Sequence, residues 1–440
     1  MSRKRFDREE RLQGEVVDLS SDGRGVVRHP DGKTVFVADA LRGEVVEYRR
    51  RKRNRSFDEA ELLEVLQASP ERVEPGCSHF GQCGGCSLQH LEPKAQLAAK
   101  QNTLEQALQR IGGGLSPVTW LAPLTGPVWG YRRRARLACK QVAGKGRVLV
   151  GFRERNGRYV ADIQSCPVLD QRMGELLIPL SDLLGGLSIP DQIPQIEASA
   201  GDNQVLLLLR HLQPLSAEDR EKLRAFAEQH AVHWYLQSGG PDTIVPLGEP
   251  CTLRYALDDY AADLEFGPGD FIQVNTALNR KMIPHALSLL NVSPGARVLE
   301  LFSGLGNFTI PLLRSGYAVT AVEGAQTLVD KGRANLARHD LQADYHVADL
   351  FACTGEESWL QESYDAVLLD PPRSGAADII PHILRRPPQN IVYVSCHPGS
   401  LARDAGSLVA GGYRLEAAGV MDMFPHTGHV ESIASFHWDP

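Results

Sequence analysis

The feature that most constrains the fold is an alternation, from about residue 271 onward, of short apolar runs with stretches of helical length. The runs are ARVLEL, YAVTAVE, ADYHVA, YDAVLLD and IVYVS, and helices are expected near 306–314, 325–339 and 377–385. Strands that alternate with helices build a parallel sheet covered on both faces. We therefore predict an α/β, doubly wound domain, whose last two strand-like runs form a pair with the final strand antiparallel.

The run IVYVS leads directly into Cys396, and His397 and Pro398 then prevent an easy continuation of the strand. Cys396 is therefore expected at the carboxyl end of a strand, where open α/β sheets bind their ligands. A thiol at that edge is a candidate nucleophile if its pKa is lowered or the substrate is held against it. The alternative is a cysteine that only packs in the core.

Polar residues also follow the other strands of this predicted sheet. The first strand leads into a turn with glycines at 304 and 306, which lets a nucleoside lie close to the backbone, and no phosphate-binding lysine follows. Glu323 ends the second strand and suits two ribose hydroxyls, while Asp349 and Asp370 end the third and fourth. The full set favours S-adenosylmethionine as cofactor. The alternative, acids that merely cap strands, does not account for the whole set.

The N-terminal region alternates short β-rich runs with Gly/Asp turns over residues 11–48, which predicts a small barrel. Residues 49–55, RRRKRNR, then place six basic residues in a run of seven. A barrel with a basic flank is typical of OB-like modules that bind RNA. A barrel that only packs on its neighbour is the alternative.

The net charge of −7 conceals two basic zones. Residues 1–55 carry 15 Lys/Arg against 10 Asp/Glu, and residues 131–158 carry 10 against one. Local basic zones on an acidic chain indicate a polyanionic partner, although solvated faces without a partner are the alternative. In the second zone, which is expected to form basic strands, the residues predicted to hold phosphates or a displaced base are Arg132, Arg133, Arg134 and Arg136, with Tyr131 beside them.

Three cysteines with the spacing C-x5-C-x2-C stand among glycines between residues 70 and 92. They are Cys77, Cys83 and Cys86, and the candidate fourth ligand is the distant Cys166. Four thiolates suit zinc or an iron–sulfur cluster, and three reduced thiols in a loop are the alternative. The remaining cysteines, Cys139, Cys251 and Cys353, have no ligand spacing and are expected to pack in the interior.

The composition, 42% hydrophobic and 23% charged over 440 residues, is that of a soluble globular protein with two or three domains. A charged N-terminus and the lack of a long apolar run predict a cytoplasmic protein with no membrane contact. Amphipathic helices are expected over 93–112 and near 216–230, the second capped by Ser216. We expect a monomer with domains at 1–69, 70–270 and 271–440.

Several of these motifs together resemble the RNA uracil-C5 methyltransferases. The resemblance rests on ELFSGLGNF, FIQVN, DPPR, VSCHP and the late HVE, together with the cysteine spacing and the N-terminal barrel, so it covers nearly the whole chain. It implies a Rossmann-like catalytic domain dependent on S-adenosylmethionine, a TRAM barrel that binds RNA, and a central α+β domain with a 4Fe–4S cluster. Members that modify uridine 1939 of 23S rRNA carry both barrel and cluster, and this chain is most similar to them.

The resemblance also implies a role for each candidate residue. Cys396 would add to C6 of the uracil, and Glu431 would remove the C5 proton after methyl transfer. The cofactor residues would be Gln273, Phe302, Asn307, Glu323, Asp349 and Asp370, although Asp370 suits the uracil edge as well as the methionine amino group. Cys77, Cys83, Cys86 and Cys166 would hold the cluster, in a structural rather than an electron-transfer role.

Two other functions compete with this hypothesis. DPPR resembles the (N/D)-P-P-(Y/F) motif of exocyclic-amine methyltransferases, which need no covalent thiol. An iron–sulfur RNA-binding or redox module with an inactive methyltransferase fold is the second, and an intact pair of Cys396 and Glu431 argues against it. Within the uracil-C5 family, a 747-type rRNA uridine or a tRNA position-54 uridine is the alternative substrate.

Overall fold

The computed structural model describes residues 10–155 and 157–439, so the first nine residues of the predicted 1–69 domain lie outside it. The chain divides into two compact units. Unit 1 comprises Met1–Thr103, Arg153–Arg158 and Phe424–His429, and unit 2 comprises Leu104–Phe152, Tyr159–Met423 and Val430–Pro440. No helix in the described residues has the length and apolar character needed to cross a membrane.

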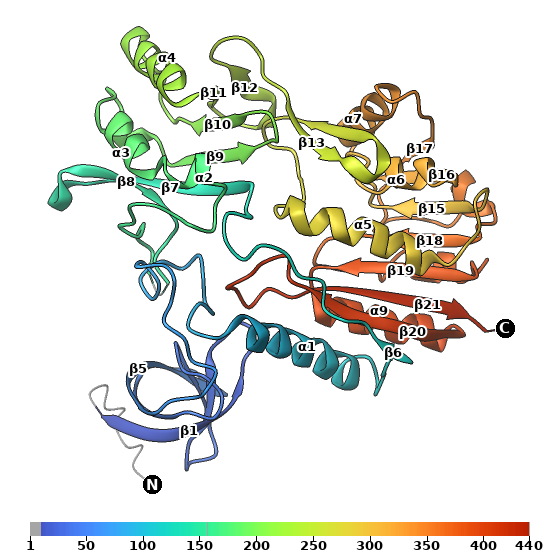
Figure 1. Ribbon diagram of the computed structural model, residues 1–440, viewed down its shortest axis with the longest axis horizontal. Coiled ribbons are helices and arrows are strands. Elements are labelled where there is room, and N and C mark those ends of the chain that lie inside the picture. Colours follow the sequence, from blue (N-terminus) through green and yellow to red (C-terminus); the bar gives the residue numbers. More distant parts are fainter. Residues whose placement is uncertain (1–9, 156, 440) are drawn as a thin grey trace. The chain divides into compact units, whose positions relative to one another are not determined.

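Unit 1 contains the small barrel that the N-terminal sequence predicts (Figure 1). Its strands are β1 (Arg11–Leu19), β2 (Gly25–Arg28), β3 (Thr34–Val37), β4 (Val45–Arg53) and β5 (Phe57–Gln67). The barrel closes because β5 pairs parallel with β3 and antiparallel with β4. Val16, Val35 and Val46 are fully buried in its core, and the closed five-strand order is consistent with an OB-like barrel.

Helix α1 (Pro93–Arg110) follows the cysteine loop and confirms the helix predicted over 93–112. Proline is favourable at its first position, where the backbone N–H has no partner within the helix.

The first part of unit 2 is a mixed sheet with the strand order β12-β11-β10-β9-β7-β8. Its strands are β7 (Arg134–Val142), β8 (Arg147–Gly151), β9 (Gln195–Ala200), β10 (Val205–Arg210), β11 (Val232–Gln237) and β12 (Ile244–Pro246). Its helices are α2 (Gln171–Gly174), α3 (Leu177–Gly185) and α4 (Ala217–His230). β7 and β8 form the predicted basic hairpin, and Ser216 caps α4 through a reciprocal pair of hydrogen bonds with Asp219.

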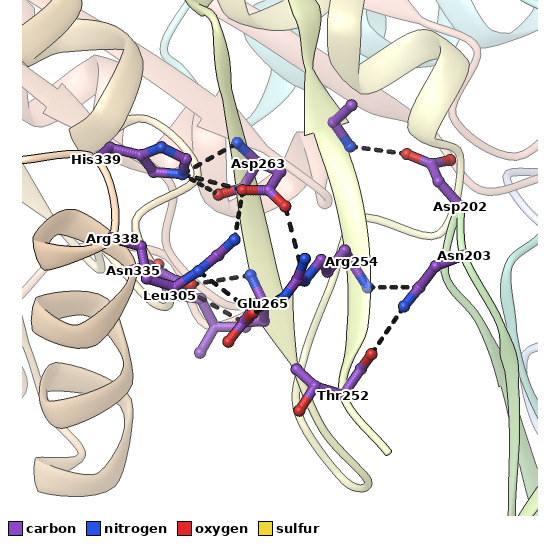
Figure 2. Close-up of polar contacts among 11 residues, drawn as sticks. Asp202, Asn203, Thr252, Arg254, Asp263, Glu265, Leu305, Asn335, Arg338 and His339 are labelled. Carbon is purple, nitrogen blue, oxygen red and sulfur yellow. Dashed lines mark hydrogen bonds and ion pairs between the residues drawn. The ribbon is translucent and has the colours of Figure 1, made fainter.

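A two-stranded hairpin, β13 (Leu253–Leu257) and β14 (Ala262–Phe266), lies between this sheet and the eight-stranded sheet of unit 2 (Figure 2). On one side the turn before β10 holds it, because Asn203 donates to the Thr252 carbonyl at 2.9 Å. On the other side α7 holds it, because Glu265 N–H donates to the Asn335 side chain at 2.8 Å and Arg338 pairs with Asp263 at 2.7 Å. The hairpin is thus fixed to both parts of unit 2.

The catalytic sheet has the order β17-β16-β15-β18-β19-β21-β20-β6 and confirms the predicted α/β domain (Figure 1). Its strands are β6 (Thr119–Trp120), β15 (Arg297–Leu301), β16 (Ala318–Glu323), β17 (Asp344–Val347), β18 (Ala366–Leu369), β19 (Asn390–Ser395), β20 (Tyr413–Met421) and β21 (Glu431–Trp438). The strands β15 to β19 are parallel, and β21 is antiparallel to both β19 and β20, as the sequence predicted.

The helices of this domain are α5 (Thr276–Leu290), α6 (Thr309–Arg314), α7 (Gln326–Ala337), α8 (Ile380–Ile383) and α9 (Pro398–Ala410). Residues of α1, α8 and α9 share a buried core with the sheet, while α5 packs against β18, β19 and β21. Two differences from the sequence prediction stand out. The helix expected near 377–385 is a single turn, and the sequence did not predict α9, which two glycines within the helix obscured.

Candidate active site

The carboxyl ends of β15, β16, β18 and β19 meet at one edge of the catalytic sheet, because these neighbouring strands are parallel and in register. Phe302, Asp370 and Cys396 each follow the last residue of a strand, and Glu323 is itself the last residue of β16. β21 begins at the same edge and runs the other way, and its Ser432 pairs with Ser395. Glu431 therefore lies next to Cys396, although 35 positions separate them along the chain.

Cys396 is half-buried, and its surroundings hold it in the thiol form. Burial raises the pKa of this thiol to about 11, and the carboxyl groups of Glu431 and Asp370 act in the same direction. The guanidinium of Arg373, in the DPPR turn after β18, acts in the opposite direction. Three side chains, from the end of β18 and the start of β21, thus act on the same sulfur, and the thiol is protonated at neutral pH.

Asp370 and Gln273 form a second polar pair at this edge. The Gln273 side chain, in the segment between β14 and α5, donates from Nε2 to Asp370 Oδ2 at 3.3 Å. Burial raises the pKa of Asp370 to about 7, against the effect of that hydrogen bond. A carboxyl with such a pKa is available in both protonation states near neutral pH.

Glu300 lies beneath the edge, within β15, and is 1% exposed. Burial raises its pKa to about 8, Asp370 and Glu323 add to the rise, and hydrogen bonding with Thr309 opposes it. One of its carboxyl oxygens, Oε2, has no hydrogen-bond partner among the residues that the structure describes. The sequence did not lead us to predict Glu300 as a site component, although a carboxylate inside the apolar run VLEL was the available signal.

The turn after β15 has the shape that a nucleoside requires. Phe302, Gly304 and Gly306 all have positive φ, at 64°, 56° and 97°. A Cβ placed on Gly304 would meet no atom of the described residues within 4 Å, its two chain neighbours aside. The Glu323 carboxylate holds the turn, because it accepts from Gly304 N–H at 3.0 Å and from Ala325 N–H at 3.2 Å. The residues at this turn therefore fit the predicted cofactor.

Aromatic rings and an exposed acid continue this surface. The Phe302 and Phe351 rings lie 5.8 Å apart at an angle of 50°. Asp349 accepts from Phe351 N–H at 3.0 Å and so fixes the loop after β17. The pair of rings provides an apolar surface suited to a base.

The Asn307 side chain forms hydrogen bonds with side chains from two other elements. Its Oδ1 accepts from the Tyr255 hydroxyl and from Asn279 Nδ2, and its Nδ2 donates to Asn279 Oδ1 at 3.1 Å. Tyr255 belongs to β13 and Asn279 to α5. Asn307 thus ties the cofactor turn to the hairpin and to α5.

The predicted metal ligands belong to both units. Cys77, Cys83 and Cys86 are half-buried in a loop of unit 1, where Gly85 N–H donates to the Cys83 sulfur at 3.4 Å. Cys166 lies in unit 2, in a turn closed by Leu169 N–H. Within residues 10–155 and 157–439, no three or more His, Cys, Asp or Glu side chains are arranged to hold a metal ion. As predicted, Cys139 and Cys251 are buried, and Cys353 packs against the catalytic core.

Three of the four arginines predicted to hold phosphates are engaged with acidic partners, and the fourth, Arg132, donates to the Arg134 carbonyl at 3.0 Å. Arg133 pairs with Asp202, and Arg134 and Arg136 both pair with the buried Glu197, at 2.6 and 2.9 Å. Arg136 is the most open of these, with 70% of its side chain exposed. Tyr131, which the sequence places beside these arginines, is 4% exposed inside unit 2 and so offers little surface to a base.

The basic run of the barrel is also paired, across the β4–β5 ladder. Arg49 and Arg51 both contact Glu61, at 2.5 Å, and Lys52 lies 3.5 Å from Glu59. The following Arg53 and Arg55 are exposed. Much of the positive charge that the sequence displays is therefore offset by the neighbouring strand.

Comparison with known proteins agrees with this geometry. The family described as tRNA (Uracil-5-)-methyltransferase matches residues 252–353 and 357–436. The chain is 51% identical, over 96% of its length and 95% of the relative, to the 23S rRNA (uracil(1939)-C(5))-methyltransferase RlmD of Alkalilimnicola ehrlichii. It is 50% identical to the enzyme of that name from Xanthomonas campestris, over 99% of each chain.

Among solved structures, the fold matches the tRNA (uracil-54, C5)-methyltransferase of Pyrococcus abyssi in complex with S-adenosyl-L-homocysteine. The TM-score is 0.74 at 24% identity, and the match covers 97% of this chain and 100% of that one. The likeness shows that the fold is that of a methyltransferase dependent on S-adenosylmethionine. The chain is therefore a methyltransferase that belongs to the family of the RlmD enzymes, the 23S rRNA (uracil(1939)-C(5))-methyltransferases.

Proposed function

We propose that this enzyme methylates C5 of one uridine of 23S rRNA, of the position-1939 type, through a covalent bond between Cys396 and C6 of the uracil. The observation that carries the proposal is the register between β19 and β21, which puts a thiol and a carboxylate side by side at the cofactor edge. The choice of 23S rRNA rests on the names of the full-length relatives.

The chemistry requires a nucleophile and a base that act in turn on neighbouring carbons. C5 of uracil is a poor nucleophile, so the Cys396 thiolate first bonds to C6, and the C5–C6 π electrons move into an enolate over C4 and O4. S-adenosylmethionine would supply an electrophilic methyl group to C5, and S-adenosylhomocysteine would leave with the electron pair of the broken methyl–sulfur bond. Glu431 then accepts the C5 proton, the C5–C6 double bond re-forms, and the thiolate of Cys396 leaves.

Activation of Cys396 follows from the charges around it. With a pKa near 11, the free thiol is a weak nucleophile, which protects the enzyme from side reactions before the RNA binds. Arg373 already favours the thiolate, and any change that neutralises Asp370 or Glu431 acts in the same direction. Glu431 is 8% exposed, so water has little access to the base.

The cofactor site proposed here comprises Gln273, Phe302, Asn307, Glu323, Asp349 and Asp370. Glu323 holds the turn and has lone pairs left for the ribose hydroxyls, and Phe302 with Phe351 offers the apolar surface for the adenine. Asn307 contributes by holding the turn rather than by presenting its side chain.

Two partners suit Asp370, the methionine amino group and the uracil edge. Asp370→Asn distinguishes these two roles. If Asp370 binds the methionine amino group, the variant should have a higher KM for S-adenosylmethionine. If Asp370 binds the uracil edge, the variant should form the adduct more slowly even with saturating cofactor. The pKa of about 7 fits either role near neutral pH.

For the cysteines we propose a 4Fe–4S cluster with Cys77, Cys83, Cys86 and Cys166 as ligands and a structural role. Support comes from the spacing and from the N–H donated to the Cys83 sulfur, a contact that suits a thiolate. Protein purified without air should be brown and contain about four irons per chain by metal analysis. A colourless protein with one zinc ion per chain would contradict the proposed iron–sulfur cluster.

RNA binding is proposed for the TRAM-like barrel and the basic strands of unit 2. A target uracil leaves its stack to reach the thiol, which costs a few kcal/mol and is least costly in a loop. The exposed basic residues, such as Arg53, Arg55 and Arg136, are the better candidates for phosphate contacts.

The experiment that tests the proposed function is nucleoside mass spectrometry of 23S rRNA from a deletion strain, after incubation with the enzyme and S-adenosylmethionine. We expect 5-methyluridine at a single position, and none with Cys396→Ala. Cys353→Ala is the matched control, because that thiol is also half-buried with a pKa near 11. An N-methylated product, or full activity of Cys396→Ala, would favour the amine methyltransferase; methylation of tRNA or of another rRNA uridine would revise the substrate.

A further inference from the structure

Residues 267–275, called here the Gln273 segment, join the β13–β14 hairpin to α5 without regular structure of their own. Gln273 in this segment reaches Asp370 at the catalytic edge. Its neighbours Phe271 and Ile272 are 67% and 4% exposed. The position of Gln273 must therefore be set by whatever holds the segment on either side.

Arg134, on β7, holds the segment upstream of Gln273. Its guanidinium donates to the carbonyls of Gly269, at 3.2 Å, and Asp270. The same group is fixed by the buried Glu197, whose Oε1 accepts from Nε at 3.0 Å and from Nη2 at 2.6 Å. Because only 13% of its side chain is exposed, Arg134 is poorly placed to meet a phosphate.

Lys331, on α7, holds the same point from the catalytic domain. Its Nζ contacts both carboxylate oxygens of Asp270, at 2.6 and 2.7 Å. The Asp270 carboxylate also accepts from Gly267 N–H at 2.7 Å, which closes the turn at the start of the segment. Asp270 is therefore held by Arg134 of the mixed sheet and by Lys331 of α7.

The segment is also fixed downstream of Gln273. Arg133 N–H donates to the Val274 carbonyl at 2.9 Å. Asn275 is fully buried, caps α5 through Leu278 N–H at 3.1 Å, and donates to the Met423 carbonyl at 3.4 Å. Gln273 therefore projects from a short stretch held at both ends.

We propose that Arg134 and Lys331 are positioning residues for methyl transfer, which act by holding Asp270 so that Gln273 keeps its contact with Asp370. The inference rests on the proposed function, and it assigns Arg134 to this internal role rather than to an RNA phosphate.

The test measures single-turnover methyl transfer to a 23S rRNA fragment containing the target uridine, together with the RNA Kd and its salt dependence. Arg134→Met and Lys331→Met should each lower the single-turnover rate about 10-fold or more, since small misplacements of catalytic groups cost up to ~100-fold. The RNA Kd and its salt slope should stay as in the wild type. Lys331→Arg, which keeps the ion pair, should restore most of the rate.

Two further variants make the assignment specific. In a Gln273→Ala background, Arg134→Met and Lys331→Met should have little additional effect, because residues that act through one another are not additive. Arg338→Met is the matched control on the same helix, since Arg338 pairs with Asp263 of the hairpin and not with the segment, and its rate should stay within about two-fold.

Each other result decides against the inference. A weaker RNA Kd with a smaller salt slope in Arg134→Met would make it a phosphate contact. Unchanged rates in both variants, or an equal fall in the Gln273→Ala background, would show that neither residue acts through Gln273. If Arg134→Met does not fold, Lys331→Met carries the test, because its side chain is 45% exposed. Failure of the wild type to form 5-methyluridine would instead overturn the proposed function.

Discussion

The catalytic edge and the two basic runs show how differently sequence patterns translate into surfaces. At the catalytic edge, neighbouring parallel strands end at the same side of the sheet. The residues at these strand ends, Cys396, Asp370 and Glu323, therefore lie close together although they come from separate segments of the chain. In the basic runs, residues adjacent in sequence share a strand, and their charges are met by acids on the next strand. Glu61 and Glu197 each form ion pairs with two arginines in this way.

Strand order in a parallel sheet thus brings the residues of separate motifs together, whereas pairing with acids on neighbouring strands reduces the charge of a basic run. The pairs that Arg49 and Arg51 form with Glu61 lie near the surface and are worth little individually, so they do not add much stability. They do reduce the charge offered to a polyanion. The basic surface of this chain is therefore smaller than its sequence indicates.

The largest effect is expected at the edge, from Glu431→Gln. Without a base for the C5 proton, turnover should fall by about 10²–10⁴-fold. Cys396 still adds to the uracil and C5 still takes the methyl, so a methylated RNA–enzyme adduct should accumulate on denaturing gels. Glu416→Gln on β20 is the control. Loss of turnover with no adduct would show that Glu431 is needed before methyl transfer rather than after it.

A second effect concerns the acid buried beneath the edge. Because the folded-state pKa of Glu300 is raised to about 8 from a usual value near 4.5, its stabilising contribution is complete below pH 4.5 and is lost as the pH rises toward 8. Ionisation of Glu300 should lower the free energy of unfolding by about 1.4 kcal/mol for each pH unit between pH 4.5 and 8. Glu300→Gln, which stays neutral, should not show this fall.

Urea unfolding at pH 5, 6.5 and 8 measures this prediction. The free energy of unfolding of the variant should exceed that of the wild type increasingly as the pH rises. A difference that does not change with pH would show that Glu300 is ionised in the folded protein, and the edge would then be more negative than described here.

The smallest effect is expected in the basic run of the barrel. Arg53→Ala with Arg55→Ala should weaken RNA binding a few-fold and reduce the salt slope by up to about two, roughly one for each phosphate contact. Arg51→Ala should change the slope little, because Glu61 already offsets that charge. An equal loss in Arg51→Ala would mean that the ion pairs open when RNA binds, and the contrast with the edge would weaken.

Much of the fold and the outline of the edge were predictable from the sequence. The apolar run before Cys396 specified a strand and its end, and the alternation of strands and helices specified the sheet. The environment of each residue was not predictable in the same way. Arg134 lies 63 positions from Glu197, and no local pattern links them. Asn307 matches a cofactor motif, yet its side chain bonds to Tyr255 and Asn279, which only the packed hairpin and α5 bring near.

An RNA fragment with 5-fluorouridine at the target position would reveal the covalent bond between Cys396 and the uracil. After addition and methyl transfer, the fluorine at C5 cannot be removed as a proton is, so the bond to the enzyme should persist. Peptide mass spectrometry should place the methylated nucleotide on Cys396, and Cys396→Ala should form no adduct while Cys353→Ala forms it normally. An adduct on another residue, or methylation without any adduct, would contradict the covalent role of Cys396.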